Sequence, residues 1–373
     1  GSSRLGPSCT LSAARHESAM LVLTSFGGAM TALLCGLFCW GSWGAAMKSS
    51  RLAYAAASVY FIAAQMAVSC LVCFTLGMVS TESSPELFLE ALVNVDMLGA
   101  VACIMGGVLN ANAMALLTRA IAIGGVAVAV PAVNGSGLVG GSILTFAFDP
   151  KGNPVLLFGG VLSCLVALLC NARAYALKDD SSAAERREGL LKRDCVASKA
   201  EHLEEAASDT MHAVKDLLAT EAASRQLLLR VCLTGGLLCA LWSPMSAWAS
   251  KNRSVAAYLV LFFFNLGQLL VIPSLLSKVR AEGLDLGTTR QKLACLAAGA
   301  LNCLGLVCMF VAGSGVSFPM AYGIMMCSPL VASLLGVCFG ELRGASWARV
   351  VYFCMMLLAY GAAIVGIALS QAD

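Results

Sequence analysis

Carboxamide side chains inside the most apolar parts of this chain are its best candidates for specific chemistry. We single out six that lie in apolar runs: Asn110, Asn112, Asn134, Asn265, Gln268 and Asn302. A carboxamide both donates and accepts hydrogen bonds, and its burial in lipid is costly unless it faces protein, water or a ligand. Two interpretations follow, namely hydrogen bonds between helices or the wall of a polar cavity. We predict that these six residues contact a substrate.

Two tryptophans, Trp43 and Trp242, complete the predicted binding set. They lie at mirrored places toward the ends of two apolar runs. Tryptophan anchors helices at the membrane interface, but its ring also stacks on flat ligands. Amides and indoles together suit small, flat, uncharged molecules with imide or urea groups.

Charged and metal-binding groups are scarce in the apolar runs. Asp149 and Glu341 stand at the ends of such runs, and no carboxylate stands in the middle of one. The three histidines, His16, His202 and His212, lie in polar segments. We therefore expect no enzyme activity, no metal and no cofactor. Proton coupling stays open, since it commonly uses an acid within the membrane.

The elements that must hold these side chains are membrane-spanning helices. The 373 residues are 59% hydrophobic and only 12% charged, whereas soluble domains carry roughly 25% charged residues. A helix crosses the hydrocarbon layer with about 20 apolar residues. The sequence predicts ten such spans, at 26–47, 53–77, 97–117, 121–148, 154–175, 229–248, 255–276, 292–313, 318–339 and 350–370.

One long polar segment divides the spans into two groups of five. We expect a disordered tail over 1–22, five helices over 23–175, a cytosolic and partly helical linker over 176–227, five helices over 228–370 and a short tail over 371–373. The 17 cysteines lie almost entirely in apolar runs, where free cysteine behaves as a small hydrophobe.

Lysine and arginine set the expected orientation. With both termini outside, the inner loops hold most of these residues, including the whole linker. Cytoplasmic loops carry an excess of Lys and Arg. The distribution predicts a multi-pass protein, most naturally of the plasma membrane, with both termini outside and the linker in the cytosol.

The two groups of five spans share a faint internal repeat. "GGVLN", ending at Asn110, matches "AGALN", ending at Asn302, and the same offset pairs Asp149 with Glu341. Because five is odd, the second copy enters the membrane in the opposite direction. Inverted repeats of this kind are typical of secondary transporters, which bind substrate near the midplane between the repeats.

Several segments resemble a known family. "GGAMTALLCGLFCWGSWGAAM" is similar to the opening helix of the ureide permeases, and "LTGGLLCALWSPMSAWASKN" is similar to their sixth helix. The segment 298–343, ending in "FGELR", resembles their helices 8 and 9. Ureide permeases belong to the drug/metabolite transporter superfamily, and the related glucose/ribose porters share much of this pattern. The resemblance implies ten helices in two inverted repeats.

This resemblance implies a secondary carrier of small neutral heterocycles, such as allantoin, uracil or oxopurines, working by alternating access. Two alternatives stay open. A sugar porter of the glucose/ribose type would also use amides and tryptophan. A scaffold or receptor that transports nothing would instead act through its linker. The expected partners are a small-molecule substrate and the lipid bilayer, with no nucleic acid.

Overall fold

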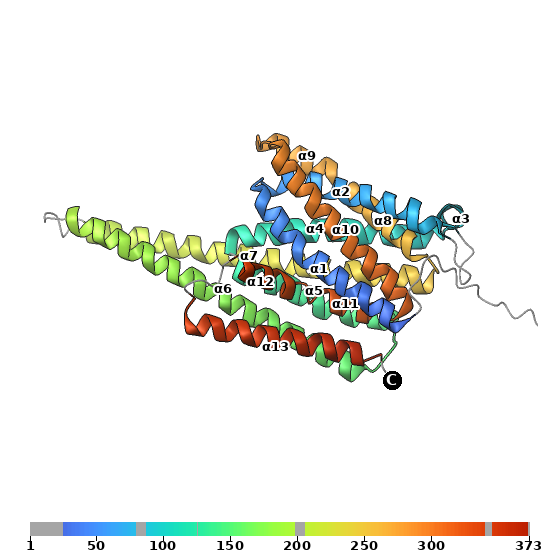
Figure 1. Cartoon of the computed structure of the whole chain (residues 1–373). Helices are drawn as coiled ribbons and strands as arrows, with labels where there is room; N and C mark the ends of the chain where they lie inside the picture. Colours follow the sequence, from blue (N-terminus) through green and yellow to red (C-terminus); the bar gives the residue numbers. More distant parts are fainter. Residues whose placement is uncertain (1–24, 80–86, 125, 198–205, 340–344, 372–373) are drawn as a thin grey trace, which may run out of the picture.

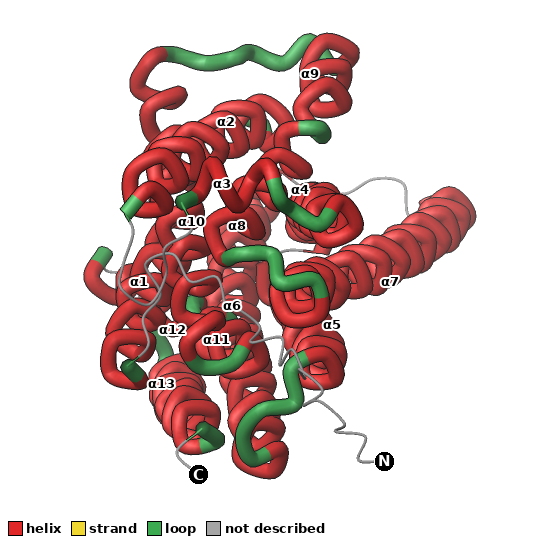
Figure 2. The backbone as a smooth tube through the Cα atoms, turned by 90° about the vertical axis from the view of Figure 1, so that its right-hand side faces the viewer, coloured by secondary structure: helices red, strands yellow, loops and turns green. Residues whose placement is uncertain are grey.

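The computed structural model describes residues 25–79, 87–124, 126–197, 206–339 and 345–371, and every regular element in these ranges is helical. Most helices run side by side in one bundle (Figures 1 and 2). The elements are α1 (Phe26–Ser50), α2 (Tyr54–Thr75), η1 (Leu76–Met78), α3 (Phe88–Val93), α4 (Met97–Gly124), α5 (Val126–Phe148), α6 (Pro154–Ala197), α7 (Ala206–Asn252), α8 (Ala257–Leu269), α9 (Ile272–Ala281), α10 (Thr289–Gly315), α11 (Phe318–Met325), α12 (Pro329–Cys338) and α13 (Trp347–Leu369).

Nine helical spans in the described ranges are long and apolar enough to cross a membrane. Two of these spans each contain two helices: α8 with α9 form one span, and α11 with α12 form another. The predicted span 121–148 corresponds to α5, which is 23 residues long and is not among the nine. The chain is thus an all-helical, multi-pass membrane protein.

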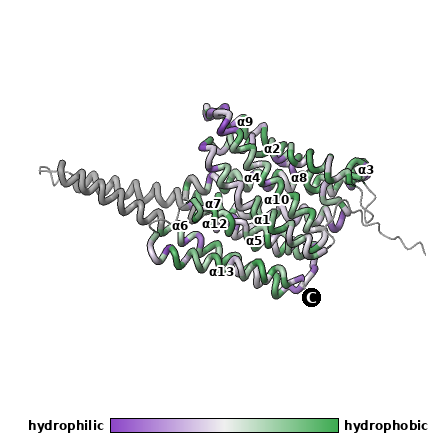
Figure 3. Tube along the Cα trace, viewed as in Figure 1, coloured by the Kyte–Doolittle hydropathy of each residue, from purple (hydrophilic) through white to green (hydrophobic). Residues whose placement is uncertain are grey.

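The outer surface of the bundle is apolar, as lipid contact requires. Large side chains such as Leu71, Leu162 and Leu358 are more than half exposed. Figure 3 shows hydrophobic residues along the lengths of the helices and hydrophilic ones at the outer turn of α9. In a membrane, lipid covers these side chains and keeps them away from water. Their exposure on the surface of the bundle is therefore expected of a membrane protein.

Proline interrupts two of the spans. Pro273 stands in the first turn of α9, directly after α8, and Pro329 opens α12, directly after α11. Proline lacks a backbone N–H and fits the first turn of a helix, but it breaks a helix interior. Pro131 and Pro244 lie inside α5 and α7, which continue through them.

Two helices extend into the segment 176–227, which the sequence predicts to be a partly helical linker. α6 continues without interruption from Pro154 to Ala197, and α7 begins at Ala206. Both helices extend beyond the rest of the bundle (Figure 1). We call the end of the bundle from which they extend the α6–α7 end. We call the opposite end, where α13 stops at Leu369, the α13 end. The first turn of α1 lies at the α13 end as well (Figure 1).

Helix packing follows a paired pattern. α1 packs against α10 and α4 packs against α7, while α2 packs against α10 and α4 against α8. Two glycines make close crossings possible. A methyl group at Gly107 of α4 would overlap the carbonyl oxygen of Phe264 in α8, and one at Gly299 of α10 would overlap that of Phe61 in α2. Both crossings therefore bring two backbones into direct contact.

Candidate binding cavity

A cavity of about 110 Å³ lies in the interior of the bundle. Its walls come from α1, α2, α4, α5, α6, α7, α10 and the start of α12, together with the turn before it. The lining residues are Trp40, Trp43, Phe61, Asn110, Met114, Leu117, Asn134, Leu138, Leu168, Cys239, Trp242, Asn302, Leu306, Met326, Ser328 and Pro329. Sites for drug-sized ligands occupy about 300–1,000 Å³, so this conformation suits a much smaller molecule.

The wall of the cavity is neutral. None of its lining residues, all within the described ranges, is Asp, Glu, Lys or Arg. Its polar groups are three asparagine amides, the hydroxyl of Ser328, the Cys239 thiol and the indole N–H groups of its tryptophans. A charged ligand would lose its hydration without gaining a counter-charge. The cavity therefore suits uncharged molecules that form hydrogen bonds.

The cavity lies near mid-depth of the helices that supply its amides. Asn302 is 13 residues from each end of α10, Thr289 and Gly315. At 1.5 Å per residue, that is about 20 Å from either end. Asn110 is similarly central in α4, between Met97 and Gly124. The two amides that the internal repeat equates thus line one space from different helices.

Five of the eight residues predicted to contact substrate meet at this cavity: Trp43, Asn110, Asn134, Trp242 and Asn302. Within the described part of the chain, the side chains of Asn110 and Asn134 make no hydrogen bond. Their donors and acceptors are available to a ligand.

Trp242 is a packed wall rather than an interfacial anchor. Only 2% of it is exposed. Its ring lies 6.3 Å from Trp40, 5.3 Å from Phe264 and 5.6 Å from Tyr322, centroid to centroid. Edge-to-face and tilted pairs at these distances are favourable. The cluster holds the indole rigidly beside the cavity.

The other three predicted residues lie elsewhere. Asn112 is exposed, and its amide nitrogen donates to the Val108 carbonyl of its own helix at 2.8 Å. Asn265 and Gln268 are buried in α8 and bind other side chains and backbone rather than lining the cavity. For these three residues, the geometry fits the other interpretation of the amides, in which they form hydrogen bonds within the protein.

Gln65 of α2 is a polar residue of the site that the sequence did not single out. It is fully buried. Its Oε1 accepts from Asn302 Nδ2 at 2.8 Å, and its Nε2 donates to Gln268 Oε1 at 3.1 Å. Gln268 Nε2 in turn lies 3.4 Å from Asn265 Oδ1. A chain of four carboxamides thus leads from α8 to the cavity wall. Its signal in the sequence was one glutamine in an apolar run.

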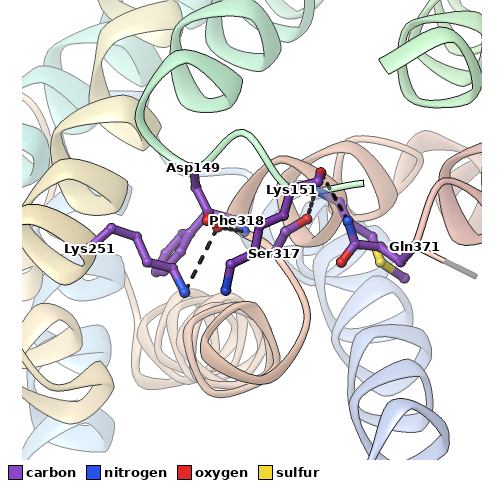
Figure 4. A network of polar contacts seen from close by, with 7 residues as sticks. Asp149, Lys151, Lys251, Ser317, Phe318 and Gln371 are labelled. Carbon is purple, nitrogen blue, oxygen red and sulfur yellow. Dashed lines mark hydrogen bonds and ion pairs between the residues drawn. The ribbon is translucent and has the colours of Figure 1, made fainter. Parts of the chain in front are cut away.

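Asp149 joins three helices at the α13 end of the bundle (Figure 4). This residue directly follows α5 and is 3% exposed. Its carboxylate accepts from the backbone N–H of Phe318, the first residue of α11, at 3.0 Å and lies 3.8 Å from Lys251 Nζ of α7. The Lys251 ammonium also lies 5.7 Å from the centre of the Phe318 ring. Glu341, its predicted counterpart, is outside the described residues.

A larger hollow of about 1,020 Å³ lies at the α6–α7 end, between α1, α10 and α12. Lys48, Arg51 and Arg290 are among its lining residues. Gly41 of α1, which lines this hollow, packs against Val331 of α12 and against the carbonyl of Ser328, which lines the cavity. We call the hollow the vestibule.

Comparison of the sequence with models of known protein families gives no match, and comparison with curated protein sequences gives no match either.

Proposed function

We propose that this protein is a secondary carrier that moves small, neutral, polar heterocycles, such as ureides or nucleobases, by alternating access. The observation that carries the proposal is the neutral cavity at mid-depth of the bundle, with amides and indole rings in its wall. Flat rings with imide or urea groups match both features, because amides bind their edges and tryptophan their faces. The resemblance of the first and sixth spans to ureide permeases points to the same substrates.

The proposal includes ten spans in two inverted repeats, and the helix packing supports it. If α1, α2, α4 and α6 correspond to α7, α8, α10 and α13, then α1 on α10 is equivalent to α7 on α4. Likewise α2 on α10 is equivalent to α8 on α4, and α6 on α13 is equivalent to itself. This is the contact pattern expected of a pseudo-twofold axis between repeats.

The glycine crossings support the same axis. The spacing of 192 residues that relates Asn110 to Asn302 also relates Gly107 to Gly299. Gly107 meets the Phe264 carbonyl of α8, and Gly299 meets the Phe61 carbonyl of α2. The two carbonyls belong to residues 203 apart, the same spacing that separates Gln65 from Gln268. These two glutamines hydrogen-bond to each other, as residues beside a twofold axis can.

Alternating access needs one closed and one open end, and the two ends of this bundle differ. At the α13 end, Asp149 ties α5 to α7 and α11. At the α6–α7 end, the vestibule reaches the α1–α12 contact beside the cavity. We propose that this conformation is closed at the α13 end and that substrate passes through the vestibule.

Ligand-induced stabilisation of the purified protein tests this function. A ligand that binds only the folded state stabilises it by about 2.7 kcal/mol at 100 times its Kd. We expect uracil or allantoin to raise the unfolding midpoint and glucose to leave it unchanged. Stabilisation by glucose alone would favour the sugar porter, and no response to any of the three would contradict a carrier of these compounds.

Asparagine variants test whether the ligand binds in the cavity. We expect Asn110→Ala and Asn302→Ala each to weaken ligand binding about 3- to 10-fold, since a hydrogen bond contributes about 0.5–1.5 kcal/mol. The matched control is Asn112→Ala, which removes an amide from the same helix as Asn110 but outside the cavity. Equal affinity in all three variants would contradict the assignment. It would also favour the scaffold alternative if deleting 178–225 abolished the cellular function.

A further inference from the structure

The carboxamide chain that ends at the cavity has a fixed direction. It starts at the backbone carbonyl of Leu261, to which Asn265 Nδ2 donates at 2.9 Å. A backbone carbonyl can only accept. Asn265 must therefore turn its nitrogen toward Leu261 and its Oδ1 toward Gln268, which donates from Nε2 at 3.4 Å.

Each further link follows from the one before. With its nitrogen toward Asn265, Gln268 offers Oε1 to Gln65, whose Nε2 donates to it at 3.1 Å. Gln65 Oε1 then faces Asn302, whose Nδ2 donates to it at 2.8 Å. Turning any single amide around would place two oxygens or two NH₂ groups against each other. Turning all four would place Asn265 Oδ1 against the Leu261 oxygen.

The anchor exists on only one side of the bundle. The spacing of 203 residues that relates Gln65 to Gln268 relates Ile62 to Asn265. Ile62 has no amide, so α2 offers no counterpart of the bond from Asn265 to Leu261. The chain of amides has a single end at which a backbone carbonyl sets its orientation. The two glutamines bond reciprocally, because Gln268 Nε2 also donates to Gln65 Oε1 at 3.4 Å, and this pair keeps Gln65 Oε1 as the acceptor of Asn302.

We propose that this chain makes Asn302 an obligate hydrogen-bond acceptor in the cavity and so selects ligands that carry an N–H or O–H group. The proposal rests on the proposed function for its substrate class and narrows that class. Gln65 binds one of the two N–H groups of Asn302 Nδ2, which prevents the amide from turning around, so Oδ1 stays an acceptor at the cavity that Asn302 lines. Gln65, Gln268 and Asn265 are positioning residues. Asn110 and Asn134 lack such partners and adapt to either kind of group.

A neighbouring donor is also unavailable to the ligand. The indole Nε1 of Trp40 donates to the backbone carbonyl of Asn302 at 3.1 Å. This bond ties α1 to α10 beside the cavity. Next to Asn302, the wall thus presents an oxygen to the ligand. A ligand whose ring nitrogen carries a methyl group or a lone pair at this place would leave that oxygen without a hydrogen bond.

Uracil and its N-methyl derivatives form the first test. In the wild-type protein, we expect methylation of the ring nitrogen that contacts Asn302 to weaken binding at least about tenfold, judged by comparing 1-methyl-, 3-methyl- and 1,3-dimethyluracil with uracil. Gln65→Met keeps the side-chain length but frees the Asn302 amide to turn. In this variant, the loss of affinity on methylation should fall below about threefold. Gln65→Glu, a neutral carboxyl in this buried apolar position, donates its O–H to Gln268 and still accepts from Asn302, so it should restore the discrimination.

The variants separate hydrogen bonding from steric exclusion. A methyl group that merely fails to fit would be rejected by Gln65→Met as strongly as by the wild type, and that result would overturn the proposal. Equal binding of uracil and 1,3-dimethyluracil to the wild type would overturn it too, while leaving the carrier function in place. Asn112→Ala is the control and should behave as wild type.

A second measurement needs no ligand. The side-chain NH₂ of Asn302, assigned by NMR from its loss in Asn302→Asp, should exchange with solvent at least about tenfold more slowly than those of Asn110 and Asn134. Exchange should speed up in Gln65→Met. If none of the uracil probes binds, the proposed substrates are wrong, and this exchange still decides the orientation. Equal exchange of all three amides in the wild type would overturn it.

Discussion

At the scale of single residues, the polar groups of this protein serve two purposes. Gln65, Gln268 and Asn265 satisfy one another inside the bundle. Asn110 and Asn134 face the cavity without a partner among the described residues. Interhelical hydrogen bonds in membranes are typically worth about 0.6 kcal/mol, and at most about 1–2 kcal/mol. The amide chain therefore adds little stability, and its larger effect is to orient Asn302.

Asp149 is the residue whose loss should weaken the closed end most. We expect the unfolding midpoint in detergent to fall in the order wild type, Asp149→Asn, Asp149→Ala. Asparagine keeps an acceptor for the Phe318 N–H but loses the attraction to Lys251. Alanine also loses the charged hydrogen bond, worth about 1.5–3 kcal/mol. Thermal unfolding followed by light scattering measures the order.

Asp96→Asn is the matched control for this series. Asp96 accepts from the Gly99 N–H at 2.8 Å and lies 3.8 Å from Arg253, and its side chain is 39% exposed. Asparagine caps helices as well as aspartate does, and exposed ion pairs contribute at most about 1 kcal/mol. Its midpoint should stay near that of the wild type. An Asp149→Ala midpoint equal to that of Asp96→Asn would refute the structural role of Asp149.

At the scale of helices, close backbone crossings hold the cavity walls in place. The crossings at Gly107 and Gly299 lie one turn before Asn110 and Asn302 in their helices. A helix that moved outward at such a crossing would carry its cavity amide with it. The spacing of the cavity walls thus depends on residues that do not touch the cavity.

Substitution of these two glycines tests the dependence. Gly107→Ala and Gly299→Ala should each lower the unfolding midpoint and weaken ligand binding, because the added methyl group overlaps a carbonyl oxygen and forces the helices apart. Overpacking of this kind costs roughly 1–3 kcal/mol. Gly159→Ala on α6 is the control, since a methyl group there meets nothing within 4 Å. A wild-type midpoint in either crossing variant would show that the helices do not meet as described.

At the scale of the whole molecule, the two ends of the bundle differ in charge. Lys48, Arg51 and Arg290 line the vestibule at the α6–α7 end, and the last turn of α9 adds Arg280 and Lys278, the latter 3.8 Å from Glu282. At the α13 end, the cations Lys251 and Arg253 pair with Asp149 and Asp96. An excess of Lys and Arg marks the cytoplasmic side of a membrane protein. We therefore expect the α6–α7 end, and with it the vestibule, to face the cytosol.

Proteolysis of sealed vesicles tests this orientation. A protease that cuts after Lys and Arg should cleave between α6 and α7, for example at Arg186, Arg187, Lys192 or Arg193, only when the cytosolic face is outward. An epitope placed after Asp373 should show the opposite accessibility, because α13 ends at the other face. Cleavage of 186–193 in right-side-out vesicles would reverse the topology.

The sequence by itself determined that this protein is a bundle of apolar helices and roughly where most of them lie. Length and hydropathy suffice for that, because the bilayer fixes how many apolar residues a span needs. The sequence also singled out the amides, since a polar group is conspicuous in an apolar run. Even the separation of Asn110 from Asn112 follows from helix geometry, as residues two apart point to nearly opposite faces at 3.6 residues per turn.

Only the tertiary structure decided which amides face the cavity and which face one another. In a soluble helix, the apolar stripe marks the inner face, but in a membrane both lipid and protein neighbours are apolar. The hydrophobic pattern of the sequence therefore does not show which side of a helix faces the interior. It cannot predict that Asn302 lines the cavity while Asn265 binds Leu261. Gln65 enters the site through the packing of α2 on α8 and α10. The direction of the amide chain depends on contacts between helices more than 190 residues apart in sequence, which no local pattern records.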